Sequence, residues 1–155
     1  MKVLVVGAGA REHALAAALL AHGDCDVVCA PGNPGIALDV PVRPLDASDP
    51  DAVLALAVAE AVDLTVIGPE APLAAGVADR FAAAGRPLFG PTRAAAQLET
   101  SKAFAKSLMA RHGVPTARAI TCDSADQALA AVRAGTLGWP VVVKADGLAA
   151  GKGVV

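Results

Sequence analysis

The fold is decided by Lys2-Val-Leu-Val-Val-Gly-Ala-Gly-Ala-Arg-Glu-His13, an apolar run that ends at Gly7 and passes directly into a helical pattern. Residues 11–22 are rich in Ala and Leu, and Gly23 then stops the helix. A continuous apolar strand followed at once by a helix is typical of a parallel sheet that is covered on both faces. The stretch therefore predicts the first strand (residues 2–6) and the first helix of an α/β domain.

The same alternation continues to about Pro91. We predict further strands at residues 26–30, 40–42, 64–67 and 87–89, and further helices at residues 48–61 and 74–84. Ser48 has the residue type of an N-cap for the first of these helices, and Pro50 lies in its first turn. Right-handed crossovers then give a doubly wound, Rossmann-like domain over residues 1–100. Its ligand is expected beyond the carboxyl ends of the strands.

The pattern changes after Thr92. A helical pattern covers residues 92–111 with a break at Thr100-Ser101, and Ser124 caps another helix that runs to about residue 134. Short apolar runs at residues 118–122 and 140–144 predict strands, and a glycine-rich segment follows the second run. We interpret residues 101–155 as the start of a second domain. The strand that pairs with residues 141–143 is expected to lie beyond them.

The composition narrows the class of protein. Hydrophobic residues make up 55% of the 155 residues and charged residues 18%, which excludes a disordered chain. The net charge of −2 and the scattered basic residues argue against a nucleic-acid surface, and no apolar stretch approaches the ~20 residues that span a bilayer. Cys25, Cys29 and Cys122 lack the spacing of a metal site and are interpreted as reduced thiols. We expect a cytoplasmic protein and favour a monomer.

The first motif is a GxGxxE pattern formed by Gly7, Gly9 and Glu12. Its glycines permit a tight turn and the close approach of a phosphate to free N–H groups at a helix start. A dinucleotide site also needs an acid after the second strand, and Ala30-Pro31-Gly32 supplies none. We favour a phosphate-bearing sugar over a dinucleotide, and a purely structural turn is the remaining alternative.

Four polar side chains are candidates for binding that sugar. Arg11 is expected to pair with the phosphate and Glu12 to hydrogen-bond sugar hydroxyls. Asn33 and Glu70 follow the second and a later strand, and the prolines around Glu70 fix its direction. An ordinary connecting loop is the alternative at both positions. His13 is interpreted as a structural hydrogen-bonding residue.

The last motif combines Val141-Val-Val-Lys144 with Gly147, Gly151, Lys152 and Gly153. Its GxxxGK spacing is not that of a Walker A loop, because Gly153 stands where Ser or Thr would bind magnesium. A lysine that ends a buried strand has few structural explanations, since an unpaired buried ammonium is costly. We interpret Lys144 as a ligand-binding residue and the glycine segment as a lid over a triphosphate.

The segment Lys144-Ala-Asp-Gly-Leu-Ala-Ala-Gly-Lys-Gly-Val154 resembles the nucleotide-covering loop of the ATP-grasp ligases. Its form is most similar to that of the phosphoribosylamine–glycine ligases, also called glycinamide ribonucleotide synthetases. Other stretches similar to the same family are residues 3–13, Ala30-Pro-Gly-Asn33, residues 63–73, Phe89-Gly-Pro-Thr92 and residues 94–113. The resemblance runs from residue 1 to residue 155.

The resemblance implies an enzyme of purine biosynthesis that joins glycine to 5-phosphoribosylamine. ATP is cleaved to ADP and phosphate, glycyl phosphate is the intermediate, and magnesium is the cofactor. Positions that the resemblance assigns to ATP are Lys102, Lys144, Gly147, Gly151, Lys152 and Gly153. Positions that it assigns to 5-phosphoribosylamine are Gly7, Gly9, Arg11, Glu12, Asn33 and Glu70.

Two departures from the family pattern are visible. The family usually has more consecutive glycines than Gly7-Ala-Gly-Ala10, so the methyl groups of the two alanines are expected to narrow the binding pocket slightly. The family's acidic magnesium ligands lie downstream of the glycine loop, so we assign no catalytic or metal-binding residue here. Residues 1–155 alone are therefore expected not to catalyse ligation. The alternatives are a non-catalytic nucleotide- or sugar-phosphate-binding module and, less favoured, a nicotinamide-dependent oxidoreductase.

Overall fold

The structure is a computed structural model that describes residues 1–149. The chain forms two compact units, Met1–Ala96 and Gln97–Val155. No helix among the described residues combines the length and the apolar character that a membrane crossing requires.

The first unit alternates strands and helices. Its elements are β1 (Lys2–Gly7), α1 (Ala10–Ala21), β2 (Asp26–Pro31), η1 (Ile36–Leu38), α2 (Pro50–Ala59), β3 (Leu64–Ile67), α3 (Glu70–Ala75), α4 (Val77–Ala83) and β4 (Leu88–Phe89). The four strands form one parallel sheet in the order β2-β1-β3-β4. The chain first adds β2 on one side of β1 and then returns to add β3 on the other side. The strand order therefore reverses between β1 and β3.

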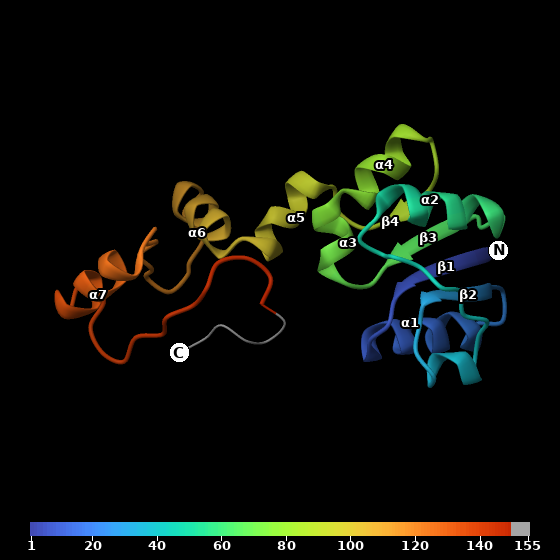
Figure 1. Cartoon of the computed structure of the whole chain (residues 1–155), viewed down its shortest axis with the longest axis horizontal. Helices are drawn as coiled ribbons and strands as arrows, with labels where there is room; N and C mark the ends of the chain where they lie inside the picture. Colours follow the sequence, from blue (N-terminus) through green and yellow to red (C-terminus); the bar gives the residue numbers. More distant parts are fainter. Residues whose placement is uncertain (150–155) are drawn as a thin grey trace. The chain divides into compact units, whose positions relative to one another are not determined.

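The alternation of side chains along β1 builds a core on each face of the sheet. Val3 and Val5 pack with Ala16 of α1, whereas Leu4 and Val6 belong to the cluster that contains Phe81 of α4. Figure 1 shows α1 on one side of the sheet and α2 and α4 on the other. The predicted doubly wound α/β domain is thus confirmed, with a core made mainly of small aliphatic side chains.

The predicted strand at residues 40–42 is reduced to a single bridge between Val42 and Cys29. The flanking hydrogen bonds run from Cys29 N–H to Pro41 O and from Arg43 N–H to Cys29 O, each at 3.0 Å. Pro41 and Pro44 have no N–H group, so the segment cannot continue a regular ladder along β2.

Two helix boundaries differ from the sequence-based expectation. Asp49, not Ser48, caps α2, because its Oδ1 accepts from the N–H of Asp51 at 2.9 Å, while Ser48 binds Asp46 instead. The helix predicted at residues 74–84 begins earlier, at Glu70, and is divided into α3 and α4 by Gly76, whose φ is +99°. Only glycine adopts this left-handed backbone without strain.

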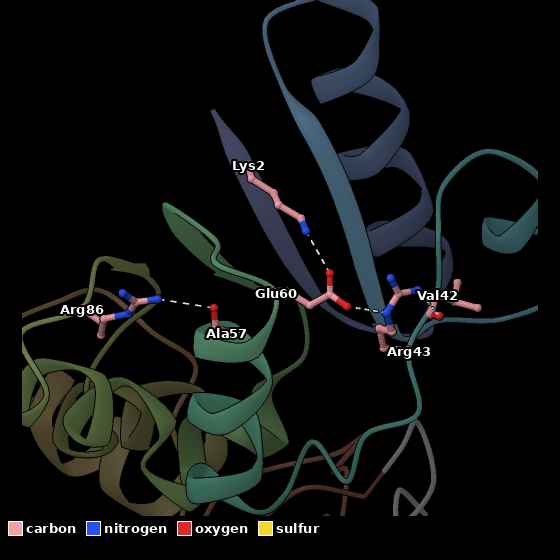
Figure 2. A network of polar contacts seen from close by, with 6 residues as sticks. All are labelled: Lys2, Val42, Arg43, Ala57, Glu60 and Arg86. Carbon is pink, nitrogen blue, oxygen red and sulfur yellow. Dashed lines mark hydrogen bonds and ion pairs between the residues drawn. The ribbon is translucent and has the colours of Figure 1, made fainter.

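A network of charged side chains ties the start of β1 to the end of α2. Figure 2 shows the Glu60 carboxylate between Lys2, whose Nζ donates at 2.9 Å, and Arg43, whose Nε donates to the other oxygen. Nearby, Arg86 donates to the carbonyl groups of Ala57 and Val62, each at 3.3 Å. The hydrogen bonds from Lys2 and then Arg43 lower the pKa of Glu60, so its charge is retained at neutral pH.

The described part of the second unit is helical. Its elements are α5 (Arg93–Thr100), which contains the division between the units, α6 (Lys102–Arg111) and α7 (Ala125–Arg133). The predicted break at Thr100-Ser101 is confirmed, because Ser101 is the N-cap of α6 and its Oγ accepts from Phe104 N–H at 3.1 Å. Ser124 caps α7 in the same way, through Gln127 N–H at 3.2 Å.

In the described part of the chain, the strand predicted at residues 118–122 does not form, and the one predicted at residues 140–144 is reduced to a single β-bridge residue, Lys144. Val142 and Val143 are 61% and 46% exposed, so the prediction that they form a buried strand before Lys144 is wrong. A strand requires a neighbour for its backbone hydrogen bonds, and residues 97–149 contain no named strand that could serve as one. A run of apolar residues is therefore not enough to form a strand when no neighbouring strand is present to pair with it.

Candidate functional site

The loops that follow β1 and β3 meet at the point where the strand order reverses. In open parallel sheets this point, at the carboxyl ends of the strands, is where ligands bind. The loop after β1 carries Gly7 and Gly9 into α1, and the loop after β3 carries Gly68 into α3. Gly68 N–H donates to Val6 O at 3.0 Å, which keeps the two loops adjacent.

An ion pair connects these two loops. Arg11, in the first turn of α1, donates from Nη1 to Oε1 of Glu70, the first residue of α3, at 2.9 Å. The side chains are 65% and 33% exposed, so both lie at the surface of the switch point. The hydrogen bond from Arg11, followed by one from the backbone N–H of Glu70, lowers the pKa of the Glu70 carboxyl. A guanidinium and a carboxylate therefore stand together, charged, where a ligand is expected.

Glu12 lies beneath the same loops. It is 3% exposed, its Oε2 accepts from Gly9 N–H at 2.5 Å, and its Oε1 has no hydrogen-bond partner among the described residues. Side chains at the surrounding glycines would collide with it: a Cβ at Gly7 would lie 2.5 Å from Glu12 Cγ, and a Cβ at Gly68 would lie 2.1 Å from Oε1. The glycines thus make room for a buried carboxylate, and this geometry places Glu12 under the loops rather than at their surface.

Asn33 joins the loop after β2 to the loop after β1. Its Nδ2 donates to Ala8 O at 2.8 Å, and its Oδ1 accepts from the N–H groups of Gly35 and Ile36 at 2.8 and 3.0 Å. All these partners are backbone groups, so the amide holds the two loops in register. The structure therefore gathers Gly7, Gly9, Arg11, Glu12, Asn33 and Glu70 at one edge of the sheet.

Two further residues at this edge, Asp39 and Cys29, were not predicted from the sequence to belong to the site. Asp39 binds His13 through Oδ2 and Nε2 at 2.6 Å, which gives His13 the structural bond that was predicted for it. The Cys29 thiol donates to Gly7 O at 3.5 Å, and burial, with a smaller contribution from the charge of Glu12, raises its pKa. His13 and Asp39 are 26 positions apart, and no local motif connects them.

In the second unit, two of the residues predicted to bind ATP meet. Lys102 Nζ donates to Gly147 O at 2.8 Å across 45 positions of sequence. Lys144 is exposed in the same segment as Gly147. The predicted residues Gly151, Lys152 and Gly153 lie outside the described residues. Within residues 1–149, no group of three or more His, Cys, Asp and Glu side chains could hold a metal ion.

Sequence reasoning missed Asp146. Its carboxylate accepts hydrogen bonds from the start of α6, 44 positions away, including one from Lys102 N–H at 2.6 Å. No spacing rule connects residues so far apart. The signal available was its position inside the lysine–glycine motif, where it is the one acidic residue between Lys144 and Gly153.

Two family models cover the chain. The model described as phosphoribosylglycinamide synthetase, N domain, matches residues 1–99. The model described as phosphoribosylglycinamide synthetase, ATP-grasp (A) domain, matches residues 100–155.

The relatives agree with both matches. The phosphoribosylamine–glycine ligases of Xylella fastidiosa (strain Temecula1) and Leifsonia xyli are 55% and 57% identical over all of this chain, which spans 36% and 37% of their lengths. The crystal structure of phosphoribosylamine–glycine ligase from Thermotoga maritima matches with a TM-score of 0.76 at 30% identity, over 100% of this chain and 35% of that one. N5-carboxyaminoimidazole ribonucleotide synthetase from Thermotoga maritima shares the fold, with a TM-score of 0.66 at 18% identity, over 99% and 40% of the two chains. The chain belongs to the phosphoribosylglycinamide synthetase family.

Proposed function

We propose that the protein is a carbon–nitrogen ligase that joins glycine to 5-phosphoribosylamine and cleaves ATP to ADP and phosphate. The observation that carries this proposal is the match of both family models in sequence order over residues 1–99 and 100–155. The chain spans about 36% of the length of the relatives it matches, so the activity concerns the whole protein. The product is glycinamide ribonucleotide.

The reaction has two steps. A carboxylate oxygen of glycine attacks the γ-phosphorus of ATP, the bond to the β-phosphate bridging oxygen breaks, and ADP leaves. The amine of 5-phosphoribosylamine then attacks the carbonyl carbon of the glycyl phosphate. Phosphate leaves, the nitrogen loses a proton, and the amide bond is complete.

The first unit supplies the 5-phosphoribosylamine site in this proposal. Arg11 pairs with the ligand's phosphate and Glu70 accepts a hydrogen bond from its amine or hydroxyl groups. Gly7, Gly9, Glu12 and Asn33 shape the wall of the site. Support comes from the Arg11–Glu70 ion pair at the switch point and from the bonds of Glu12 and Asn33, which fix the two adjoining loops.

The second unit supplies part of the ATP site. Lys102 and Lys144 interact with the nucleotide, and the glycine segment from Gly147 through Gly151, Lys152 and Gly153 covers its β- and γ-phosphates. Support comes from the approach of Lys102 to Gly147 and from the ATP-grasp family match. Magnesium neutralises phosphate charge when bound. By the family resemblance, we place its ligands downstream of the glycine segment.

We further propose that the domain boundary falls at residue 100, between a substrate-binding domain and an ATP-grasp domain. The compact units divide after Ala96 and the family models divide after residue 99, which supports this boundary. The three cysteines are free, which is consistent with the reducing conditions of the cytoplasm, where we place the protein.

The test is an assay of the full-length native protein. ADP release is measured with ATP, magnesium, glycine and 5-phosphoribosylamine, and then with each component omitted. We expect ADP release only with the complete set, together with a product whose mass is that of glycinamide ribonucleotide. ATP binding without turnover in the complete mixture would support the rival, a non-catalytic binding module, and would overturn the proposal.

A further inference from the structure

The carboxylate of Asp146 occupies the start of α6. Its Oδ1 accepts from the backbone N–H groups of Lys102 and Ala103 at 2.6 and 3.2 Å, and its Oδ2 accepts from the Ser101 hydroxyl at 3.0 Å. Figure 1 shows the segment that follows α7 running back toward α6, which is how residues so distant in sequence come together.

These bonds complete the N-terminus of α6. The first N–H groups of a helix have no partner within the helix, and the helix dipole favours a negative charge beside them. Ser101 Oγ accepts from Phe104 N–H, and Asp146 takes the N–H groups of the two preceding residues. The backbone hydrogen bond from Ala103 is the largest cause of the lowered pKa of Asp146, so the carboxylate is charged at neutral pH.

A second contact fixes the neighbouring residue. Lys102 Nζ donates to Gly147 O at 2.8 Å, so Lys102 binds residues 146–147 through both its backbone and its side chain. Gly147 has a φ of +82°, a backbone conformation that favours glycine, and the proposed phosphate-covering segment begins there. The start of that segment is thus attached to a helix end at two adjacent residues.

We propose that Asp146 is a positioning residue that anchors Gly147 to the N-terminus of α6 and so holds this residue, where the proposed phosphate-covering segment begins, in place for nucleotide phosphates. This inference rests on the proposed function for the identity of the ligand. Asp146 acts through the backbone of Gly147 and through Lys102, and it does not itself touch the nucleotide. The negative charge of Asp146 is stabilised by the α6 N–H groups and the Ser101 hydroxyl that bind it.

The anchor is tested directly by amide hydrogen exchange in the full-length native protein without nucleotide. We expect the N–H groups of Lys102 and Ala103 to exchange at least about tenfold faster in Asp146→Ala than in the wild type, because their acceptor is lost. Asp146→Asn keeps Oδ1 as an acceptor and is expected to exchange at an intermediate rate. Asp123→Asn, which removes an exposed charge before α7, is the matched control. Equal exchange in the wild type and Asp146→Ala would overturn the anchor.

The consequence for the nucleotide is measured as the Kd of ATP in the same proteins. We expect Asp146→Ala to raise this Kd about tenfold, with Asp146→Asn between it and the wild type and the KM for glycine within about twofold of its wild-type value. A purely structural role would lower Tm and leave the Kd of the folded protein unchanged, and that result would overturn the positioning role. Absence of ATP binding by the wild type would instead reject the proposed function, while the exchange rates still decide the anchor.

Discussion

Glu12 places a carboxylate beneath the loops that follow β1 and β3, with one oxygen bound to Gly9 N–H. Burial of such a group is costly unless its oxygens are satisfied, and Oε1 has no partner among the described residues. Gly7 and Gly68 lie so close to the Glu12 side chain that a Cβ atom at either position would collide with it. At the scale of single residues, the glycines that the sequence suggested for phosphate binding also leave the space that the buried Glu12 side chain occupies.

Replacement of Glu12 by Ala is expected to lower the free energy of unfolding by about 1–3 kcal/mol, because Gly9 N–H loses its acceptor in a part-buried hydrogen bond. Glu12→Gln keeps an acceptor oxygen and is expected to cost less than Ala. Urea unfolding measures both. Glu99→Ala, at an exposed position on α5, serves as the control and should change stability by less than about 0.5 kcal/mol. Equal stability of Glu12→Ala and Glu99→Ala would show that the buried bond contributes nothing.

The Arg11–Glu70 pair predicts a pH dependence. The folded-state pKa of Glu70 is lowered, so the pair's contribution to stability is fully present above the unfolded pKa of about 4.3 and is lost as pH falls through the folded pKa. The stability difference between the wild type and Arg11→Met is expected to be about 0.2–1 kcal/mol at neutral pH, as for exposed pairs, and to vanish in acid. Carbon-13 NMR titration of the Glu70 carboxyl should give a higher midpoint in Arg11→Met. An identical midpoint in both proteins would mean that the pair does not form in solution.

At the scale of elements, tight boundaries between strands and helices position the site. β1 ends at Gly7 and α1 begins at Ala10, so little chain is available to move the residues between them. The helices that follow β3 then press their apolar side chains on the sheet, with Phe81 of α4 1% exposed in the centre of that core. The placement of α3 and α4, and with it that of the loop after β3, therefore depends on this packing.

The packing of α4 on the sheet is tested with two phenylalanines of the same unit. Phe81→Ala is expected to cost about 3–5 kcal/mol of unfolding free energy, because it removes a fully buried ring and leaves a cavity. Phe89→Ala, in β4, removes a ring that is 71% exposed and should cost less than about 1 kcal/mol. Chemical denaturation of both variants measures the difference. If Phe89→Ala proved as costly as Phe81→Ala, the assignment of the core would be wrong.

At the scale of the whole molecule, the sequence predicts the strands of the sheet better than it predicts contacts between residues that are far apart in the chain. Apolar runs bounded by Gly or Pro correctly predicted β1, β2, β3 and β4, because the apolar side chains of a strand and the residues that end it lie next to one another in the sequence. The bonds from Arg11 to Glu70 and from Lys102 to Asp146 join residues 59 and 44 positions apart, which no local pattern reports. Strand pairing at residues 140–144 failed for the same reason, since a strand also needs a neighbour.

The proposed role of Lys144 in binding ATP can be tested by substitution. Lys144→Ala in the full-length native protein is expected to weaken ATP binding by roughly 1.5–3 kcal/mol, the range for a hydrogen bond to a charged group. Isothermal titration calorimetry with ATP measures the change. Lys106 is a suitable control, because its Nζ binds Thr116 Oγ1 and Ala117 O, and Lys106→Ala should leave the Kd unchanged. An unaltered Kd in Lys144→Ala would remove Lys144 from the ATP site.

The central claim is that glycine is activated as glycyl phosphate before the amide bond forms. Glycine labelled with oxygen-18 in its carboxylate, supplied with ATP, magnesium and 5-phosphoribosylamine to the full-length native protein, tests it most directly. We predict that each inorganic phosphate released carries one labelled oxygen, because the carboxylate oxygen that attacks phosphorus departs with it. Release of ADP with unlabelled phosphate would contradict the glycyl phosphate route, and no ADP release at all would contradict the ligase assignment.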